Sequence, residues 1–358
     1  MYTLVYFFMS LIIPLALSLK PQNRISFLGY QWNILVIVAL FVVVVVRAFA
    51  YDTGADYLVY YENYLYEGKT LWGENREIGF KWLNSILHFF SDSPHLFFGF
   101  AAFVYMYAIL MVSQLFGKAD KWIVFFWSVI LFVLSYNLYR QYFSLSFILL
   151  GYYWFEKKNY VATCILGILA VLFHTSAAVG LALIAGIYLV RNRNVHRNYL
   201  LVAIMLTTIL STTILSSFLN QLSFISDFYF LATEKNYTTD RMLETMYEIS
   251  NLTYPLMVVY MIFIWYGDKL IKEYPSYRFL FYLFSFALII NPLTNQEILM
   301  RIRLYLDFFI PFFLGILAYQ YRRVIRYPIL WVALLFIIAR FIHILNNNGI
   351  AFPLKFKF

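Results

Sequence analysis

Long apolar runs separated by short polar clusters recur along the whole chain. Most of these runs approach the roughly 20 residues that an α-helix needs to cross a hydrocarbon core about 30 Å thick. The pattern therefore predicts an all-α fold, that of a polytopic membrane protein with about twelve transmembrane helices. The predicted helices are residues 2–19, 31–50, 95–115, 122–136, 139–155, 160–174, 176–190, 199–216, 251–267, 279–293, 303–320 and 328–345.

The composition supports this class and excludes an ordinary soluble domain. Of the 358 residues, 63% are hydrophobic and 13% are charged, and the mean hydropathy is +0.72. Soluble domains carry about 25% charged residues. The single cysteine, Cys164, lies inside an apolar run, so we expect neither disulfides nor thiolate metal sites. Because no linker, low-complexity segment or internal repeat is visible, we predict one integral membrane domain over residues 1–358.

The distribution of charge predicts the orientation in the membrane. If both termini face outside, the inner connections hold 15 of the 27 Lys and Arg residues but only 4 of the 18 acidic residues. The reverse topology would violate the positive-inside rule. The net charge of +9 thus reflects orientation and contact with anionic lipid, and we expect no nucleic-acid binding. The inner connections are residues 20–30, 117–121, 156–159, 191–198, 268–278 and 321–327.

Two outer loops, residues 51–94 and 217–250, are long and rich in aromatic, acidic and amide side chains. Aromatic rings stack on the apolar faces of sugars, while carboxylates and amides bind sugar hydroxyls. The tyrosines of the first loop are therefore candidate sugar ligands, and the alternative for each is an aromatic belt at headgroup level. Farther along this loop, apolar residues recur at helical spacing, which predicts a helix in the membrane interface. These residues are Ile78, Trp82, Leu83, Ile86, Phe89 and Phe90.

A cation and an amide open one of the predicted helices on the outer side. The stretch "SYNLYRQYFSLS" places Arg140 and Gln141 at the start of the helix over residues 139–155. A cation at a helix N-terminus faces the positive end of the helix dipole, which is unfavourable unless an anion binds there. Arg140 therefore indicates a phosphate or carboxylate ligand. The alternative is an arginine that extends to lipid headgroups.

The stretch "FHTSA" lies between two short predicted helices. Residues 160–190 carry no charge, and both ends of this segment are predicted to be cytoplasmic. Two helices must share it, so each spans only about 23 Å at 1.5 Å per residue. We therefore expect His174, at the apex, to lie in a recessed pocket. The alternative is a hydrogen-bonded structural histidine.

Arginines also occur at two further outer positions. The stretch "NPLTNQEILMRIRLYLDFF" opens an inward-running helix with Arg301 and Arg303, and Arg47 lies at the outer end of the second predicted helix. Arg303 and Asp307 are four residues apart, so a local ion pair is the alternative to ligand binding by Arg303.

Taken together, these motifs resemble the EpsG family of polysaccharide polymerases. An arginine at a helix end is followed by Gly-x-Asp, ending at Asp56, then by a tyrosine-rich helix and by Glu-x-Gly-Phe from Glu77. The stretches "RQYFSLSF", "FHTSA" and "RIRLYLDFF" follow in the order of the family, and the similarity covers about residues 45–320. The second outer loop matches no pattern of the family.

The resemblance implies a GT-C-like, multispan glycosyltransferase of the Wzy type in the bacterial inner (plasma) membrane, with its active site facing the periplasm or cell exterior. It implies that oligosaccharide repeat units on undecaprenyl diphosphate are donor and acceptor, and that the lipid bilayer and a chain-length regulator are further partners. The product is then an O-antigen, capsule or exopolysaccharide. Negative charge grows on the departing diphosphate in an oxocarbenium-like transition state. Fixed guanidinium groups stabilise that charge, and the acceptor hydroxyl needs a base.

On this basis we assign predicted roles. The diphosphate-binding candidates are Arg140, Arg301 and Arg303, with Arg47 as an outer contact. The acceptor proton passes to Glu77 or Asp56, and His174 either shares this work or binds the diphosphate. The sugar-binding candidates are Asp52, Tyr57, Tyr60, Gln141 and Tyr305. We expect no cofactor, and no metal either, because the arginines supply the positive charge and two carboxylates alone rarely bind a divalent ion.

Three other activities remain open from the sequence. A ligase that moves finished chains to another lipid is chemically the nearest alternative. A flippase or transporter of lipid-linked oligosaccharide would share a basic cavity, but it is expected to show repeat symmetry and polar residues at the midplane. A membrane acyltransferase would also use a buried histidine and arginines, but it would take its donor from the cytoplasmic side, where this chain offers only short basic loops.

Overall fold

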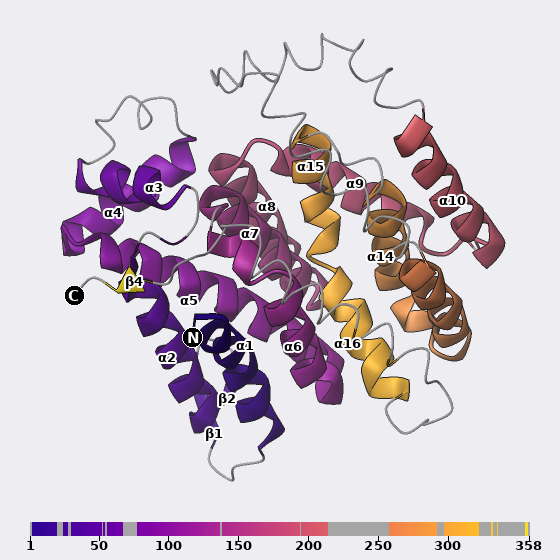
Figure 1. The fold of residues 1–358 in the computed structure, drawn as a ribbon, viewed down its shortest axis with the longest axis horizontal. Coiled ribbons are helices and arrows are strands. Elements are labelled where there is room, and N and C mark those ends of the chain that lie inside the picture. Colours follow the sequence, from indigo (N-terminus) through magenta and orange to yellow (C-terminus); the bar gives the residue numbers. More distant parts are fainter. Residues whose placement is uncertain are drawn as a thin grey trace. The chain divides into compact units, whose positions relative to one another are not determined.

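The computed structural model of the chain is predominantly helical in the part that it describes, which confirms the predicted all-α class (Figure 1). The described residues are 2–19, 24–27, 30–51, 53, 56–66, 77–136, 138–193, 195–213, 258–291, 297–321, 331, 335 and 355–356. Asp52, the second outer loop and almost all of the predicted helix over residues 328–345 lie outside them.

The chain divides into two compact units. One consists of Met1–Ala178, Leu314–Val324 and Leu334–Phe358, and the other of Val179–Phe313 and Ile325–Ala333. The single membrane domain expected from the sequence stays a prediction.

The first unit holds most of the predicted N-terminal helices close to their expected bounds. Its helices are α1 (Tyr2–Ser18), α2 (Ile34–Phe49), α3 (Tyr57–Leu65), α4 (Ile78–Phe90), α5 (Pro94–Ser113), η1 (Gln114–Ala119), α6 (Asp120–Ile130), η2 (Val133–Tyr136), α7 (Tyr139–Glu156) and α8 (Tyr160–Phe173). Its strands are β1 (Arg24–Phe27), β2 (Tyr30–Asn33), β3 (Ala50–Tyr51) and β4 (Lys355–Phe356).

The core of this unit lies where α7 packs between α5 and α8 (Figure 1). Phe97 and Tyr105 of α5 and Tyr139 and Phe143 of α7 are fully buried there. The α2 helix packs on α5, and α1 packs on α2 and α6. The predicted turn between α5 and α6 is present, because Gly117 has a φ of 56°, a left-handed conformation that glycine adopts without steric cost. Because α7 packs on both α5 and α8, the position of Arg140 in its first turn is fixed.

Two antiparallel strand pairs flank the helices. The hairpin of β1 and β2 precedes α2, and Asn33 caps that helix by accepting a hydrogen bond from the backbone N–H of Leu35 at 2.8 Å. The strand β3, directly after α2, pairs with β4 near the C-terminus. The C-terminal strand therefore lies beside the C-terminal end of α2. The predicted orientation in the membrane stays a prediction.

The predicted interface helix is α4, and large apolar side chains lie on both of its faces. Its buried face carries Gly79, Phe80, Leu83, Asn84 and Leu87. Its exposed face carries Ile78, Trp82, Ile86, Phe89 and Phe90, which are between 48% and 85% exposed. A row of exposed large apolar side chains is typical of a helix that lies in the headgroup region of a bilayer.

The second unit is also helical. Its elements are α9 (Ala177–Val190, which starts in the first unit), α10 (Arg197–Thr213), helical residues 258–273, η3 (Pro275–Tyr277), α14 (Arg278–Ile290) and α15 (Glu297–Asp307). The α14 helix packs on α10 and α15. Where one helix over residues 303–320 was predicted, α15 ends at Asp307 and α16 (Ile310–Tyr321) follows after a break at residues 308–309.

Two helical stretches of the described chain have membrane-spanning length. Among the described residues, Pro94–Ile130 and Ile302–Tyr321 are long and apolar enough to cross a membrane, and shorter apolar helices accompany them. The α8 and α9 helices have 14 residues each, which agrees with the short pair expected around His174. The number of spans and the GT-C relationship stay predictions.

Candidate functional site

The first turn of α4 lies directly on the last turn of α8, and a glycine makes this approach possible. A Cβ at Gly79 would come within 2.7 Å of the Phe173 ring and 2.8 Å of the Leu172 carbonyl oxygen. Any larger residue would push the two helices apart. Glu77 immediately precedes α4 and His174 immediately follows α8. The Glu-x-Gly-Phe and Phe-His-Thr-Ser motifs therefore meet at these two helix ends.

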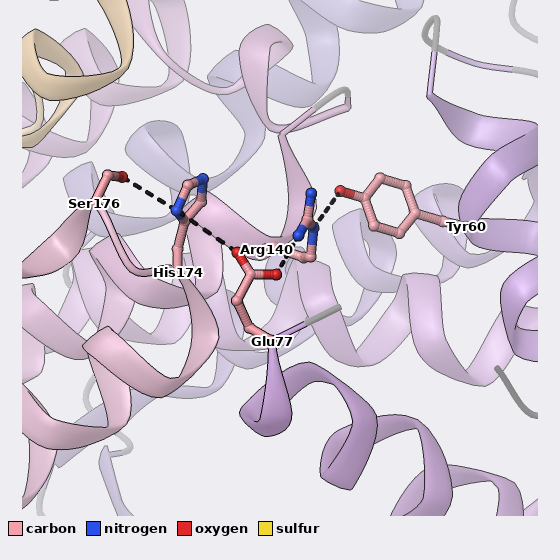
Figure 2. Close-up of polar contacts among 5 residues, drawn as sticks. All are labelled: Tyr60, Glu77, Arg140, His174 and Ser176. Carbon is pink, nitrogen blue, oxygen red and sulfur yellow. Dashed lines mark hydrogen bonds and ion pairs between the residues drawn. The ribbon is translucent and has the colours of Figure 1, made fainter. Parts of the chain in front are cut away.

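The side chains of Glu77, Arg140 and His174 converge there, as Figure 2 shows. The Glu77 Oε2 atom accepts a hydrogen bond from Nη1 of Arg140 and forms an ion pair with it. The other carboxylate oxygen, Oε1, is 3.8 Å from Nδ1 of His174. All three side chains are mostly buried, with exposed fractions of 16% for Glu77, 15% for Arg140 and 10% for His174. We call these three residues, with Tyr60, the Arg140 cluster.

Tyr60 completes the Arg140 cluster from a fourth helix, α3. The Nε atom of Arg140 donates to the Tyr60 hydroxyl at 3.4 Å (Figure 2). The Tyr60 ring itself is buried against Phe80, Phe97 and Tyr139. In the structure Tyr60 therefore makes a polar contact to Arg140, and its buried ring is not open to the sugar stacking that was predicted.

The electrostatics of the Arg140 cluster keep Glu77 ionised. Burial by itself raises the pKa of the Glu77 carboxyl group. The charge of Arg140, the neighbouring His174 ring and the hydrogen bonds to the carboxylate act against burial and outweigh it. The pKa of Glu77 therefore lies below its ordinary value of 4.5. At neutral pH the site presents a carboxylate bound to a guanidinium, a pair that an incoming anion can reorganise.

The cluster does not have the arrangement of a nucleophilic serine triad. The Ser176 hydroxyl lies 3.1 Å from Nδ1 of His174, the same ring nitrogen that Glu77 approaches (Figure 2). In a triad the serine and the acid bind opposite nitrogens of the histidine. The geometry therefore favours polar and anionic recognition over covalent catalysis by Ser176. Only the closeness of Ser176 to His174 in the chain could have indicated this contact in advance.

Arg47 is not an open outer contact in the structure, which corrects the prediction. It is 1% exposed, and its guanidinium carbon lies 3.0 Å from the centre of the Tyr136 ring. Its Nη2 atom donates to the Ser135 carbonyl at 3.0 Å and to the Tyr139 hydroxyl at 2.6 Å. A diphosphate at the surface cannot reach a guanidinium enclosed in this way. The cause is the turn before α7, which folds over the end of α2.

The predicted sugar ligands are mostly inside the protein. Tyr57 is fully buried, with its ring stacked on Phe98 at 4.6 Å and on Tyr61 at 5.8 Å. Tyr57 has no exposed surface in this structure, so its ring offers no face on which a sugar could stack. Gln141 is also buried, at 2% exposed. Three tyrosines of the first outer loop, Tyr57, Tyr60 and Tyr64, are buried against phenylalanines of α5, whereas Tyr66 is exposed.

Of the two aspartates predicted to bind or react in the first outer loop, the structure describes Asp56 but not Asp52. Asp56 is half-buried directly before α3, where its side chain makes no capping hydrogen bond. Asp52 lies outside the described residues. Within the described part of the chain, His, Cys, Asp and Glu side chains nowhere gather in groups of three that could hold a metal ion. The absence of a metal from the reaction stays a prediction.

A second arginine-centred network lies in the other unit. Nε of Arg303 donates to Asp307 at 2.8 Å, which confirms the local ion pair considered from the sequence. Nη1 of Arg303 also donates to Asn291, whose amide in turn donates to the Tyr260 hydroxyl at 2.9 Å. Arg301 lies on the same helix, α15, but its side chain is outside the described part.

Tyr305, the last predicted sugar ligand, is fully buried on α15. Its ring fills the space beside Gly180 of α9, where a Cβ would approach the ring to within 2.4 Å. The structure therefore gives Tyr305 a packing role, in contrast to the predicted contact with a sugar.

The comparisons with known proteins agree with the motifs that meet in this site. A family model described as EpsG family matches residues 32–356, nearly the whole chain. No curated protein and no solved structure matches the chain.

Proposed function

The chain belongs to the EpsG family, a membrane-integral family of Wzy-type polysaccharide polymerases, and from this premise we propose that it joins repeat units carried on undecaprenyl diphosphate. The reaction takes place at the outer face of the bacterial inner membrane. The observation that carries this proposal is the convergence of Arg140, Glu77 and His174 from three separate helix ends.

The proposed reaction is a glycosyl transfer between two lipid-linked oligosaccharides. The acceptor hydroxyl oxygen forms a bond to the anomeric carbon of the donor, and the bond from that carbon to the diphosphate oxygen breaks. The departing lipid diphosphate takes the electron pair and gains negative charge. The hydroxyl proton passes to a protein base. No nucleotide sugar or other activated donor is needed, because the lipid diphosphate is itself the leaving group.

Arg140 is suited to stabilise the leaving group. Its described contacts occupy Nη1 and Nε, while a guanidinium has five N–H donors in a planar fork. Its place at the start of α7 adds the positive end of the helix dipole. A fixed guanidinium in a site with little water stabilises developing phosphate charge far more than one in water.

Glu77 is the proposed base, and substrate binding changes its state. While Arg140 holds Glu77, the lowered pKa of this carboxyl group makes it a weak proton acceptor. A diphosphate that shares Arg140 weakens the ion pair, and the pKa of the Glu77 carboxyl group rises toward the value that burial alone favours. The base is thus activated when the donor is present. His174, 3.8 Å from Glu77, is placed to share the proton.

The structure supports a choice among the residues considered from the sequence. Glu77 contacts both Arg140 and His174, so we prefer it to Asp56 as the base. Arg303 is already bound to Asp307 and Asn291, so we assign it a smaller contribution to diphosphate binding than Arg140. Arg301 stays a candidate for that binding.

Reconstitution with purified lipid-linked repeat units tests the proposal. The wild-type protein in liposomes should convert them into a ladder of longer chains. Arg140→Ala should lower the initial rate by at least about 100-fold, because removal of one oxyanion-stabilising donor costs 10²–10³. The initial rate of Arg140→Lys should lie between those of the wild type and Arg140→Ala, because an ammonium group cannot reproduce the planar set of guanidinium donors.

A control is Arg191→Ala, which removes another arginine that contacts a tyrosine. Arg191 stacks on the Tyr188 ring and donates to the Tyr188 carbonyl, whereas Arg140 donates to the Tyr60 hydroxyl, and Arg191 lies in a predicted inner loop. It should keep the wild-type rate. Size-exclusion profile and melting temperature should show that each variant is folded. Absence of laddering by the wild-type protein would refute the proposal. Transfer of finished chains to another lipid would identify a ligase, and translocation without bond formation would identify a transporter.

A further inference from the structure

Arg47 is one of the most buried charged residues in the described part of the chain, and this burial needs a reason. A buried charge is strongly destabilising unless its environment compensates it, and a well-packed apolar residue of similar size is often less costly. Arg47 lies in the last turn of α2 and is 1% exposed. A side chain of this kind is expected where a specific geometry depends on its hydrogen bonds.

The contacts of Arg47 join the two sides of one turn. A single nitrogen, Nη2, donates to the carbonyl of Ser135, in η2, and to the hydroxyl of Tyr139, the first residue of α7. The guanidinium also lies on the Tyr136 ring at 3.0 Å and near the Tyr139 ring at 5.0 Å. Arg47 therefore holds the chain where η2 ends and α7 begins.

Tyr139 connects this contact to the Arg140 cluster. Its backbone carbonyl accepts a hydrogen bond from the Tyr105 hydroxyl at 2.9 Å, so α5 fixes it from a second side. Its ring lies 4.9 Å from the ring of Tyr60, the residue whose hydroxyl binds Arg140. Arg140 is the next residue in the chain. A shift of Tyr139 would therefore move Arg140 through the backbone and Tyr60 through the ring contact.

We propose that Arg47 is a positioning residue that acts through Tyr139 to hold Arg140 in place. This inference rests on the proposed function only for its effect on catalysis. Arginine is suited to the role and lysine is not, because the planar guanidinium donates in its plane while its face packs on tyrosine rings. The inference replaces the direct contact with diphosphate that the sequence predicted for Arg47.

The decisive variant is Tyr139→Phe, because it removes the hydroxyl that Arg47 binds and keeps both the Arg47 charge and the aromatic ring. Arg47→Lys keeps the charge and removes the planar guanidinium group. Both variants should lower kcat by about 10- to 100-fold, the range expected when a catalytic group is displaced by up to 1 Å. The KM for the lipid-linked donor should change little. The double variant should be no worse than the more affected single variant, because both remove the same contact.

A second measurement needs no substrate. Amide hydrogen exchange over residues 131–146 reports local opening of the turn and of the first turns of α7. Exchange there should be faster in both variants than in the wild-type protein. The matched controls are Arg191→Lys, which also has a tyrosine ring and a carbonyl as partners, and Tyr282→Phe, which loses a hydroxyl that donates to the Arg193 carbonyl at 2.5 Å. Both controls should keep the wild-type kcat and the wild-type exchange in this segment.

The outcomes separate this inference from the proposed function. A wild-type protein that makes no polymer refutes the proposed function, and the exchange measurement then decides the role of Arg47 alone. Unchanged exchange in Tyr139→Phe and Arg47→Lys would overturn the inference. It would also be overturned if Tyr139→Phe kept the wild-type kcat while Arg47→Lys raised the donor KM, since that result identifies Arg47 as a direct ligand.

Discussion

Two guanidinium–carboxylate pairs, one in each compact unit, form in different ways. Arg303 pairs with Asp307, four residues along the same helix, whereas Arg140 pairs with Glu77, 63 residues earlier in the chain. The first pair forms once α15 forms, because residues four apart share a helix face. The second forms only after α4, α7 and α8 have packed together. A pair that many tertiary contacts must bring together is a stronger candidate for catalysis than one that a helix supplies by itself.

The two pairs should differ most in how much the polymerisation rate falls when the carboxylate is replaced by an amide. Glu77→Gln should lower the single-turnover rate of polymerisation by about 10²- to 10⁴-fold, because it removes the proposed general base. Asp307→Asn, the matched change in the local pair, should lower this rate by less than about ten-fold, because the pair is similarly buried but has no proton-transfer role in the proposed reaction. Single-turnover rates with lipid-linked repeat units measure both. An Asp307→Asn variant as impaired as Glu77→Gln would break the comparison.

The glycines that support the two regions allow a smaller and sharper test. Gly79→Ala and Gly180→Ala each force a methyl group into a filled space, against Phe173 and Tyr305 respectively. Each should lower the free energy of unfolding by about 1–3 kcal/mol, the usual cost of overpacking. Only Gly79→Ala should also reduce the polymerisation rate of the folded protein, because it separates Glu77 from His174. Melting temperature and rate, measured on the same samples, distinguish the two effects.

The control for both glycine variants is Gly186→Ala in α9, where the added Cβ meets no atom within 4 Å. It should be neutral or stabilising by about 0.5–1 kcal/mol, because alanine favours the helix. Equal losses of rate in Gly79→Ala and Gly180→Ala would show that packing in general, and not the position of Glu77, limits the activity.

The smallest expected effect is on acid stability. Because the folded-state pKa of Glu77 is lowered, its ionised form stabilises the fold above the ordinary pKa of 4.5. That contribution is lost as the pH falls below 4.5 toward the lowered pKa. The melting temperature of the wild-type protein should therefore fall on acidification more than that of Glu77→Gln. Parallel curves for the two proteins would show that the long-range ion pair contributes nothing to stability.

Much of the helical framework follows from the apolar pattern. The predicted helices over residues 139–155 and 160–174 correspond to α7 and α8 within one residue at each end. The pattern is less informative where a helix loosens without a change in polarity. Where one helix over residues 122–136 was predicted, α6 ends at Ile130 and the 3-10 helix η2 follows from Val133 to Tyr136. Hydrophobicity reports burial in lipid or protein, but it does not report where the backbone hydrogen-bond pattern changes.

The candidate site was only partly visible in the sequence. Arg140 was indicated by its place at a helix N-terminus and His174 by its place between two short apolar helices. Glu77 was indicated by the Glu-x-Gly-Phe motif that resembles the EpsG family. Their mutual contact was not predictable, because it depends on the fit of α4 against α8 at Gly79. The roles of Arg47 and Tyr57 were misjudged for a related reason. Residue type does not reveal whether an aromatic or cationic group faces the outside or packs inward.

By itself the sequence determined that this protein is helical and apolar, and it determined which motifs bear polar groups, because these properties depend on side-chain chemistry and on periods of a few residues. The tertiary structure decided which of those motifs contact one another. Contacts between α4, α7 and α8 depend on shape and packing over more than 60 residues of chain, and no local pattern encodes the separation of two particular atoms. The same packing encloses Arg47 and keeps Arg140 partly exposed.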